Sequence, residues 1–518
     1  MEQQPDYEIL DLGHAPTVPA LLAAAVSRHG DTDYVITASD RLTYRQAADR
    51  SALLARQLLA AGVGKGTRIG IVLPSGIDFA VAFLAVARIG ATAMLFSSTY
   101  RPAELARGLR IGDVDTLIAP RVLLGRDYAP VLEAAVDGLA GHGPGPLWLP
   151  AMPYLRSIWL VGGSDRAWAT TLDLRESWLP TVEPALLAAV EDEVAPADWL
   201  LSICTSGSSA DPKLVLHTQG ATVRKTHPST GIGLQAAIPD QRVFVAMPFF
   251  WVGGPLCLLG SLHTGSPVVA QERFDGDEAL ELMERERVTI IAGWRARVDD
   301  LIAAAAASGR RLALDDPLPF LRSSKGDPVN VGMTETCGPH HNPRFFEYRI
   351  VDPQTGSSIP DGEVGEFFIR GHGLTAGIYK REREDTFDVD GWYHTGDRGY
   401  LENGRVFFLG RYSEMLKSGG ANVAPAEVEQ VLLGFPEIEE AYVVGVPHHD
   451  LGDEVVAVIV PAPNALIDEE DLRARARQVL SAYKVPRRFV VLTPDDVPRF
   501  ATGKADKRTI AANVAGTA

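Results

Sequence analysis

Apolar residues follow two patterns that alternate through the first half of the chain. Positions three and four apart are apolar in 18–25, 44–59 and 79–89, which is the spacing of helices with one buried face. Short continuous apolar runs occupy 69–73, 199–204, 243–247 and 288–292, each bounded by glycine, proline or polar residues. Such runs are typical of strands buried on both faces of a parallel sheet. The alternation predicts an α/β fold.

The pattern changes beyond residue 348. Residues 348–370 alternate in short apolar and polar steps, with turns at 353–356 and 360–362, which favours a β-rich lobe of antiparallel or barrel-like type. Beyond Arg411 the order is helix, two strands and helix, at 425–433, 440–446, 455–460 and 469–480. We therefore expect a large N-terminal domain of several lobes, with parallel sheets, over 1–411 and a small α+β C-terminal domain over 412–518.

Charge and composition exclude several kinds of partner. The chain has 66 acidic and 49 basic residues, so electrostatic binding to nucleic acid or to an anionic membrane is not expected. The first residues lack the basic start and apolar core of a signal peptide, and no run of about 18 apolar residues suggests a membrane span, which predicts a cytoplasmic protein.

Three widely spaced cysteines, Cys204, Cys257 and Cys337, predict buried thiols and neither disulfides nor a zinc site.

A loop rich in hydroxyl groups follows the apolar run 199–204. It contains Thr205, Ser206, Gly207, Ser208 and Ser209, and it ends at Lys213. Hydroxyls, free backbone N–H groups and an ammonium are the groups that bind phosphate oxygens. The spacing is not that of a Walker loop. On these residues alone, a serine-rich surface loop remains an alternative.

Four further segments follow this loop in the chain. They are Gly-Met-Thr-Glu at 332–335, Tyr-His-Thr-Gly-Asp at 393–397, the stretch 410–429 with its glycines at 419 and 420, and Pro-Arg-Phe-Ala-Thr-Gly-Lys at 498–504. Taken together and in this order, the five segments resemble the motifs of the adenylate-forming superfamily, which contains acyl-CoA synthetases, luciferases and peptide-synthetase adenylation domains. The likeness covers nearly the whole chain.

The resemblance implies a two-step reaction. A carboxylic acid attacks the α-phosphate of ATP to give an acyl-adenylate, and the thiol of coenzyme A then displaces AMP. It implies that nucleotide is bound by Thr205, Ser206, Gly207, Ser208, Ser209, Lys213, Gly332, Met333, Asp397 and Arg411. Asp397 would accept both ribose hydroxyls, because a carboxylate offers two acceptor oxygens. Arg411 would contact the ribose.

The catalytic residues that the resemblance implies are Thr334, Glu335 and Lys504. Glu335 would hold Mg²⁺ with the ATP phosphates, since this cation prefers oxygen ligands. Lys504 would bridge the carboxylate and the α-phosphate during adenylation. Without the resemblance, a lysine so close to the end of the sequence would be taken for a solvated surface group.

The family swings its small domain between the two half-reactions. Ser413 stands where relatives usually carry a charged hinge residue. In the second pose, Lys417, Gly419 and Gly420 would face the pantetheine arm of coenzyme A, because glycine permits the close backbone approach that a narrow tunnel needs. The small C-terminal domain is therefore expected to be mobile.

An acyl pocket is expected near two glycine-containing segments, by their position in the family pattern. Its predicted residues are Phe250, Trp251, Gly253, Gly293 and Trp294. A bulky apolar wall at Trp251, where relatives often have histidine, suits a hydrophobic acid. The alternative is that these aromatic residues belong to the core.

The sequence departs from the family pattern mainly on the nucleotide side. Val331 replaces the aromatic residue that stacks on adenine, which would cost about 1–3 kcal/mol of binding free energy. Ala210 and Leu214 replace family glycines, and a residue with a side chain at positive φ would cost about 1–2 kcal/mol. The segment before Gly332 is also shortened. The residues implied in thioester formation persist.

These departures predict an acyl-CoA synthetase whose ATP-dependent adenylation is weakened or lost and which acts on a supplied acyl-adenylate with coenzyme A. A separate partner enzyme would then make the adenylate, and Mg²⁺ would be needed only if ATP is used. Alternatives are a complete ATP-dependent acid-CoA ligase and a non-catalytic sensor of adenylate or acyl-CoA. A peptide-synthetase adenylation domain is less expected, because no carrier domain follows residue 518, and a luciferase-type oxygenase would need an assay to distinguish. A homodimer is the default assembly.

Overall fold

The structure is a computed structural model. It describes all residues except 1–9, 175–181, 206–212, 229–239, 294, 311–345, 354, 403–404, 412–415, 419–420, 424, 449–451, 481, 483, 500–504 and 517–518. The described residues form two compact units. One contains those up to Tyr348 together with Ile369–Tyr393, and the other contains Arg349–Phe368 and those from His394 onward. The boundary expected near residue 411 stays a prediction.

The larger sheet of the first unit has eight strands. Their order is β17 (Gly377–Ile378), β11 (Lys213–Thr218), β10 (Trp199–Thr205), β4 (Thr92–Leu95), β3 (Arg68–Ile71), β5 (Thr116–Pro120), β8 (Ser157–Val161) and β9 (Ala169–Leu172). From β10 to β9 all neighbours are parallel, whereas β11 is antiparallel to both β10 and β17. The predicted parallel sheet is confirmed.

The second sheet of this unit has five strands. Their order is β14 (Ile290–Ala292), β12 (Val243–Val245), β13 (Val268–Ala270), β1 (Asp33–Ile36) and β2 (Arg41–Thr43), and only β2 is antiparallel to its neighbour. The apolar runs that predicted β12 and β14 are longer than the strands themselves. Ala246 still donates its N–H to Ala292 at 2.7 Å, beyond the last residue of β12.

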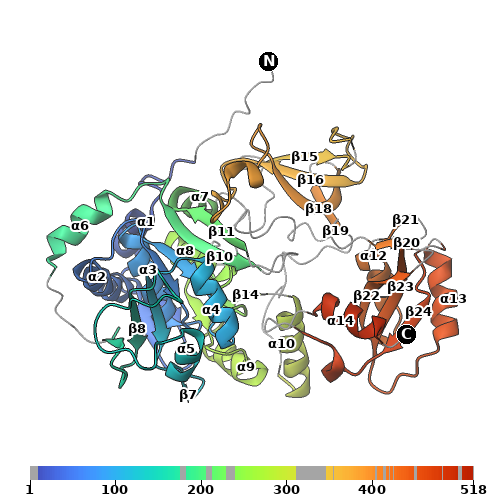
Figure 1. Cartoon of the computed structure of the whole chain (residues 1–518), viewed down its shortest axis with the longest axis horizontal. Helices are drawn as coiled ribbons and strands as arrows, with labels where there is room; N and C mark the ends of the chain where they lie inside the picture. Colours follow the sequence, from blue (N-terminus) through green and yellow to red (C-terminus); the bar gives the residue numbers. More distant parts are fainter. Residues whose placement is uncertain are drawn as a thin grey trace. The chain divides into compact units, whose positions relative to one another are not determined.

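Helices cover both sheets in layers (Figure 1). The outer face of the eight-stranded sheet packs on α4 (Pro102–Ile111) and α5 (Ala129–Ala135), and the outer face of the five-stranded sheet packs on α9 (Gly276–Arg285) and α10 (Arg295–Ala307). One core joins the facing sides of both sheets to α1 (Val18–His29), α2 (Tyr44–Ala60), α3 (Ile77–Arg88) and α8 (Gly253–Thr264). The shorter elements are α6 (Pro184–Asp192), α7 (Gln219–Lys225) and the hairpin of β6 (Val122–Leu123) with β7 (Arg126–Asp127).

The predicted β-rich lobe is a four-stranded sheet. Its order is β15 (Glu347–Val351), β16 (Gly365–Arg370), β18 (Tyr393–Glu402) and β19 (Arg405–Arg411). β18 and β19 are antiparallel, and burial along β16 alternates residue by residue, as expected of a strand with one covered face. A short 3-10 helix, η4 (Arg383–Asp385), lies between β17 and β18 in the chain.

The C-terminal part is the predicted α+β structure. Its strands are β20 (Leu416–Ser418), β21 (Ala421–Val423), β22 (Ile438–His448), β23 (Gly452–Pro461) and β24 (Arg488–Val491), and its helices are α12 (Pro425–Leu433), α13 (Glu469–Val479), η6 (Pro494–Asp496) and α14 (Lys507–Ala515). One core packs α12 and α13 on one face of β22 and β23, and a second core packs α14 on the other face (Figure 1). In the described part of the chain, no helix is long and apolar enough to cross a membrane.

Two of the three cysteines lie in the described residues, and neither is in a disulfide. Cys257 is fully buried in α8, and burial raises the pKa of its thiol to about 12. It is therefore an unreactive packing residue. Cys204, at the end of β10, is partly buried, and Cys337 lies outside the described residues.

Replacing Gly254, the second residue of α8, should destabilise the protein. A Cβ at this position would overlap Phe249 Cα and lie 2.6 Å from the Phe249 carbonyl oxygen, and both are backbone atoms that cannot rotate away. We expect Gly254→Ala to lower the free energy of unfolding by about 1–3 kcal/mol, measured by urea denaturation. Gly64→Ala is the control, because a Cβ at Gly64 meets no atom within 4 Å. Equal midpoints for the two variants would contradict the packing argument.

Candidate functional site

The segments that the sequence singled out in the first unit follow the carboxyl ends of parallel strands. The phosphate loop follows β10, the segment containing Phe250 and Trp251 follows β12, and Gly293 follows β14. In open α/β sheets, ligands bind at this edge. The fold therefore places the predicted nucleotide and acyl segments on ligand-binding edges.

The phosphate loop connects two antiparallel strands. Thr205, the last residue of β10, is the register partner of Lys213, the first residue of β11. The loop thus begins and ends at paired positions, so its ends are fixed side by side. Ser206, Gly207, Ser208, Ser209 and Ala210 lie outside the described residues.

Leu214 has a packing role that the sequence comparison with the family did not reveal. It lies in β11 opposite Cys204, is 2% exposed, and belongs to the core that also contains Met94 and Phe96. A residue inside a regular strand is extended and needs no positive φ. The expected conformational cost at this position therefore does not arise, and Leu214 is not a defect of the phosphate loop.

Hydroxyl groups at the end of β4 lie next to the base of this loop and were missed by sequence reasoning. β4 is the parallel neighbour of β10, and Tyr100, five residues beyond β4, hydrogen-bonds Cys204. Burial raises the pKa of both the Tyr100 phenol and the Cys204 thiol, so both groups stay neutral. Ser97 and Thr99 bond to each other at 2.9 Å. The signal in the sequence was a hydroxyl-rich run directly after a buried strand.

The acyl segment is a tight turn that enters α8. Trp251 donates its N–H to Pro248 at 3.1 Å, and Gly254 donates to Trp251 at 3.0 Å. Phe250 and Trp251 are partly buried and pack against the core that both sheets share. We call residues 248–254 the acyl turn.

Close packing fixes the glycines around the acyl turn. A Cβ at Gly253 would overlap the sulfur of Met247, and a Cβ at Gly293 would lie 2.9 Å from the Cβ of Ala246. Gly293 therefore lies against the end of β12, next to the acyl turn. Trp294 lies outside the described residues.

Asp397 is fully buried in β18, in the second unit. Its N–H donates to Thr395 Oγ1 at 2.9 Å, and that hydroxyl donates to the Phe367 carbonyl at 2.8 Å. Gly396, at φ +69°, donates to Glu366 at 3.0 Å. Asp397 is the register partner of Arg411 in β19. The main chain around this carboxylate is therefore held by bonds on three successive residues.

For one other predicted residue the structure gives only the strand and its register, and the rest lie outside the described residues. Lys417 is in β20, paired in register with Asn422. The remaining ones lie outside the described residues: Gly332, Met333, Thr334, Glu335, Ser413, Gly419, Gly420 and Lys504. The described residues contain no group of three or more metal-binding side chains, so Mg²⁺ rests on Glu335 as a prediction.

The residues on either side of the Lys504 segment are firmly held. Arg499 and Ala505 form an antiparallel bridge, and Asp506 donates its N–H to Pro498 at 2.8 Å. Arg499 also binds the Glu440 carboxylate on β22 at 2.5 and 2.8 Å. Both ends of the segment that carries Lys504 are thus attached to the C-terminal sheet.

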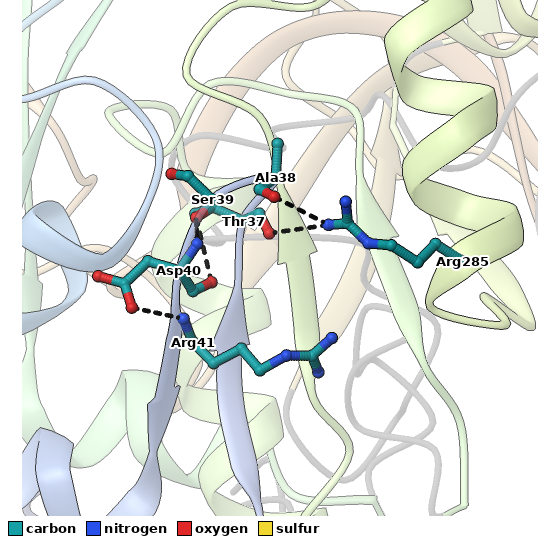
Figure 2. Close-up of a pocket in the computed structure, with 6 residues that line it drawn as sticks. All are labelled: Thr37, Ala38, Ser39, Asp40, Arg41 and Arg285. Carbon is teal, nitrogen blue, oxygen red and sulfur yellow. Dashed lines mark hydrogen bonds between the residues drawn. The ribbon is translucent and has the colours of Figure 1, made fainter.

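An open recess of about 410 Å³ at the β1–β2 turn contains none of the predicted site residues (Figure 2). It is lined by Thr37, Ala38, Ser39, Asp40, Arg41 and Arg285. Arg285 donates to the carbonyls of Thr37 and Ala38 at 3.3 and 3.1 Å, and Arg41 binds the buried Glu286 at 2.6 Å. These bonds attach α9 to the β1–β2 turn, so we assign the arginines of this recess a structural role.

Sequence comparison identifies two family domains. The AMP-binding enzyme family matches residues 22–379, and the AMP-binding enzyme C-terminal domain matches residues 427–504. The chain is 29% identical to the naringenin synthase of Pestalotiopsis fici, over 96% of this chain and 19% of that protein, so it spans about a fifth of that relative's length. It is 28% identical to the sulfoacetate–CoA ligase of Cupriavidus necator, over 98% of this chain and 99% of that protein.

Among solved structures, the anthranilate CoA ligase AuaEII in complex with anthranoyl-AMP matches with a TM-score of 0.75. The match covers 96% of this chain and 97% of that one at 19% identity, which confirms the fold. The family match covers well over half of the chain and includes β10, the phosphate loop, the acyl turn and β15 to β17. This chain belongs to the AMP-binding enzyme family, in the adenylate-forming superfamily that includes the acyl-CoA synthetases.

Proposed function

We propose that this chain forms an acyl-CoA thioester from a carboxylic acid by way of an acyl-adenylate, and that it performs the thioester half more efficiently than adenylation by ATP. The observation that carries the proposal is the buried, bonded position of Asp397 in β18. Both half-reactions require the ribose of an adenylate to be bound. The bonds around Asp397 support such a role, because they fix the main chain that carries the carboxylate, and a carboxylate can accept two hydroxyls.

The nucleotide side is where the chain has lost family residues. Leu214 lies in a regular strand and causes no conformational strain. The remaining departures are Val331, Ala210 and the shortened segment before Gly332. Loss of the adenine stack alone weakens binding about tenfold to a hundredfold. An acyl-adenylate regains affinity through its acyl group, at roughly 25 cal/mol per Å² of buried apolar surface. ATP has no such group, so it lacks this compensation for the lost adenine stack.

The proposed ligands follow from this difference between binding of ATP and binding of an acyl-adenylate. Coenzyme A is the thiol substrate, and Lys417, Gly419 and Gly420 face its pantetheine arm. The acyl donor is a small-molecule carboxylic acid adenylate supplied by a separate enzyme, or the acid itself with ATP and Mg²⁺ at Glu335. The hydrophobic acyl turn supports an acid with an apolar body.

A complete ATP-dependent acid-CoA ligase is the second candidate. Two observations favour it. Leu214 fits its strand without strain, and the likeness to the sulfoacetate–CoA ligase covers 99% of that protein. Under this alternative, Lys504 acts in adenylation on every turnover.

Removal of the Asp397 carboxylate should lower kcat/KM for thioester formation from an acyl-adenylate. Loss of a charged hydrogen-bond acceptor corresponds to about tenfold to a hundredfold. Asp397→Asn preserves the volume of the buried side chain, and Asp397→Ala removes it. Asp361→Ala, at an exposed turn of the same lobe, is the control and should leave the rate unchanged. A fall of less than about threefold in both Asp397 variants, with melting temperatures retained, would remove Asp397 from the site.

The two half-reactions should respond differently to loss of Lys504. We expect acyl-CoA formation from pre-made acyl-adenylates to be robust, while pyrophosphate release from ATP is slow with every acid of a panel containing acetate, sulfoacetate, anthranilate, benzoate and octanoate. Lys504→Ala should slow any residual adenylation by about a hundredfold and change the thioester step by less than about twofold, because its charge stabilises only the adenylation transition state.

Lys507→Ala is the control, since Lys507 binds Glu429 at 2.7 Å and should matter to neither step. Rapid pyrophosphate release with one of these acids, abolished by Lys504→Ala, would establish the complete ligase instead. Absence of thioester formation from all the adenylates would contradict both candidates.

A further inference from the structure

Phe249, at the start of the acyl turn, is held at two points by one distant element. Its N–H donates to Ser75 Oγ at 2.9 Å, and its ring meets the ring of Phe79 edge-on, with centroids 5.6 Å apart. Ser75 lies between β3 and α3, and Phe79 lies in the first turn of α3. Phe249 itself is fully buried. Both its main chain and its side chain are therefore anchored to the β3–α3 junction.

The β3–α3 junction is a rigid support. Gly76, which caps α3, has a φ of +146°, a conformation that side-chain-bearing residues rarely adopt. From Phe79 to Ala87 every residue of α3 is fully buried, and Phe79 also stacks on Phe83 with centroids 6.4 Å apart. Ser75 thus precedes a helix that is closely packed on all sides. The position of Ser75 therefore determines the position of the Phe249 N–H that it binds.

The position of Phe249 sets the position of the rest of the acyl turn. Gly254 packs so closely on the Phe249 backbone that a Cβ would overlap it, and Gly254 in turn donates to the Trp251 carbonyl at 3.0 Å. Phe250 and Trp251 lie between these two fixed residues. A shift of Phe249 must therefore carry both aromatic side chains with it.

We propose that Ser75 is a positioning residue that determines which acids the enzyme accepts, by fixing the acyl turn through the Phe249 N–H. The inference rests on the proposed function, and in particular on Phe250 and Trp251 lining the acyl pocket. Ser75 does not touch the substrate. Without its hydroxyl, the buried Phe249 N–H needs another acceptor, and the turn must move or admit a water molecule to provide one.

The test compares Ser75→Ala with Ser75→Thr, which keeps the hydroxyl, and with a matched control. In the control, Thr289→Val, the lost hydroxyl accepts the Arg242 N–H at 2.8 Å, at the opposite end of β12 and β14. Each replacement removes a hydroxyl that bonds to a distant part of the main chain in the same unit. Ser75 Oγ accepts from Phe249, and Thr289 Oγ1 also donates to the Arg242 carbonyl at 3.3 Å. Each protein is assayed as the full chain for acyl-CoA formation from the acetyl, benzoyl, anthranoyl and octanoyl adenylates.

We expect Ser75→Ala to raise KM for the preferred adenylate by about fivefold to twentyfold and to reduce its preference over the next-best adenylate by at least about threefold, since small misplacements in a binding site have large effects. KM for coenzyme A should change by less than about twofold, because the residues proposed to bind it, Lys417, Gly419 and Gly420, are not part of the acyl turn. Ser75→Thr should restore the wild-type KM and preference. Thr289→Val should show neither change at an equal shift in melting temperature.

Unchanged KM and preference in Ser75→Ala would overturn the positioning role, as would equal losses in Ser75→Ala and Thr289→Val. Trp251→Ala separates this failure from failure of the proposed pocket. If Trp251→Ala changes acid preference and Ser75→Ala does not, the pocket stands and the inference about Ser75 is wrong. If neither variant changes preference, the acyl turn does not line the pocket and both ideas fall. If Ser75→Ala does not fold, Ser75→Thr must still retain wild-type preference, and altered preference in it would count against the proposal.

Discussion

A single apolar core shared by two mostly parallel sheets is the constraint on which the first unit depends. The facing sides of the sheets bury α1, α2, α3 and α8 between them, and α3 is so apolar that its residues from Phe79 to Ala87 have no exposure. A helix that is apolar all round is stable only inside such a layer. Because both sheets are fixed to the same helices, the carboxyl ends of their strands are fixed relative to each other.

This shared layer explains how the β3–α3 junction of the larger sheet comes to hold the turn after β12 of the smaller one. Ser75 and Phe249 are 174 positions apart in the chain, yet they are joined by a hydrogen bond of 2.9 Å. Their contact spans the boundary between the sheets. The acyl turn is accordingly shaped by the packing of the interior more than by the loop sequence around Phe250 and Trp251.

Sequence periodicity predicted several of the elements but not the contacts between them. The runs 69–73 and 199–204 predicted β3 and β10, because a strand buried on both faces must be apolar at every position. The α+β content of the C-terminal part followed from equally local signals. The sequence contains no such signal for the bond between Ser75 and Phe249, since a serine before a helix indicates only a turn or a helix cap. The contact of Tyr100 with Cys204 was missed for the same reason, because the sequence of a parallel strand does not show which strand will be its neighbour.

A residue type that departs from a family pattern has a physical meaning only once its backbone conformation is known. Leu214 stands where relatives have glycine, which suggested a strained phosphate loop. In the fold it lies in an extended strand opposite Cys204, and its side chain fills the core between β11 and α4 that also contains Met94. The same replacement that would be costly at positive φ contributes packing here. The proposal of weakened adenylation therefore rests on the predicted adenine site and on position 210. In the same proposal, the acyl turn adds affinity for an acyl-adenylate at the other end of the ligand.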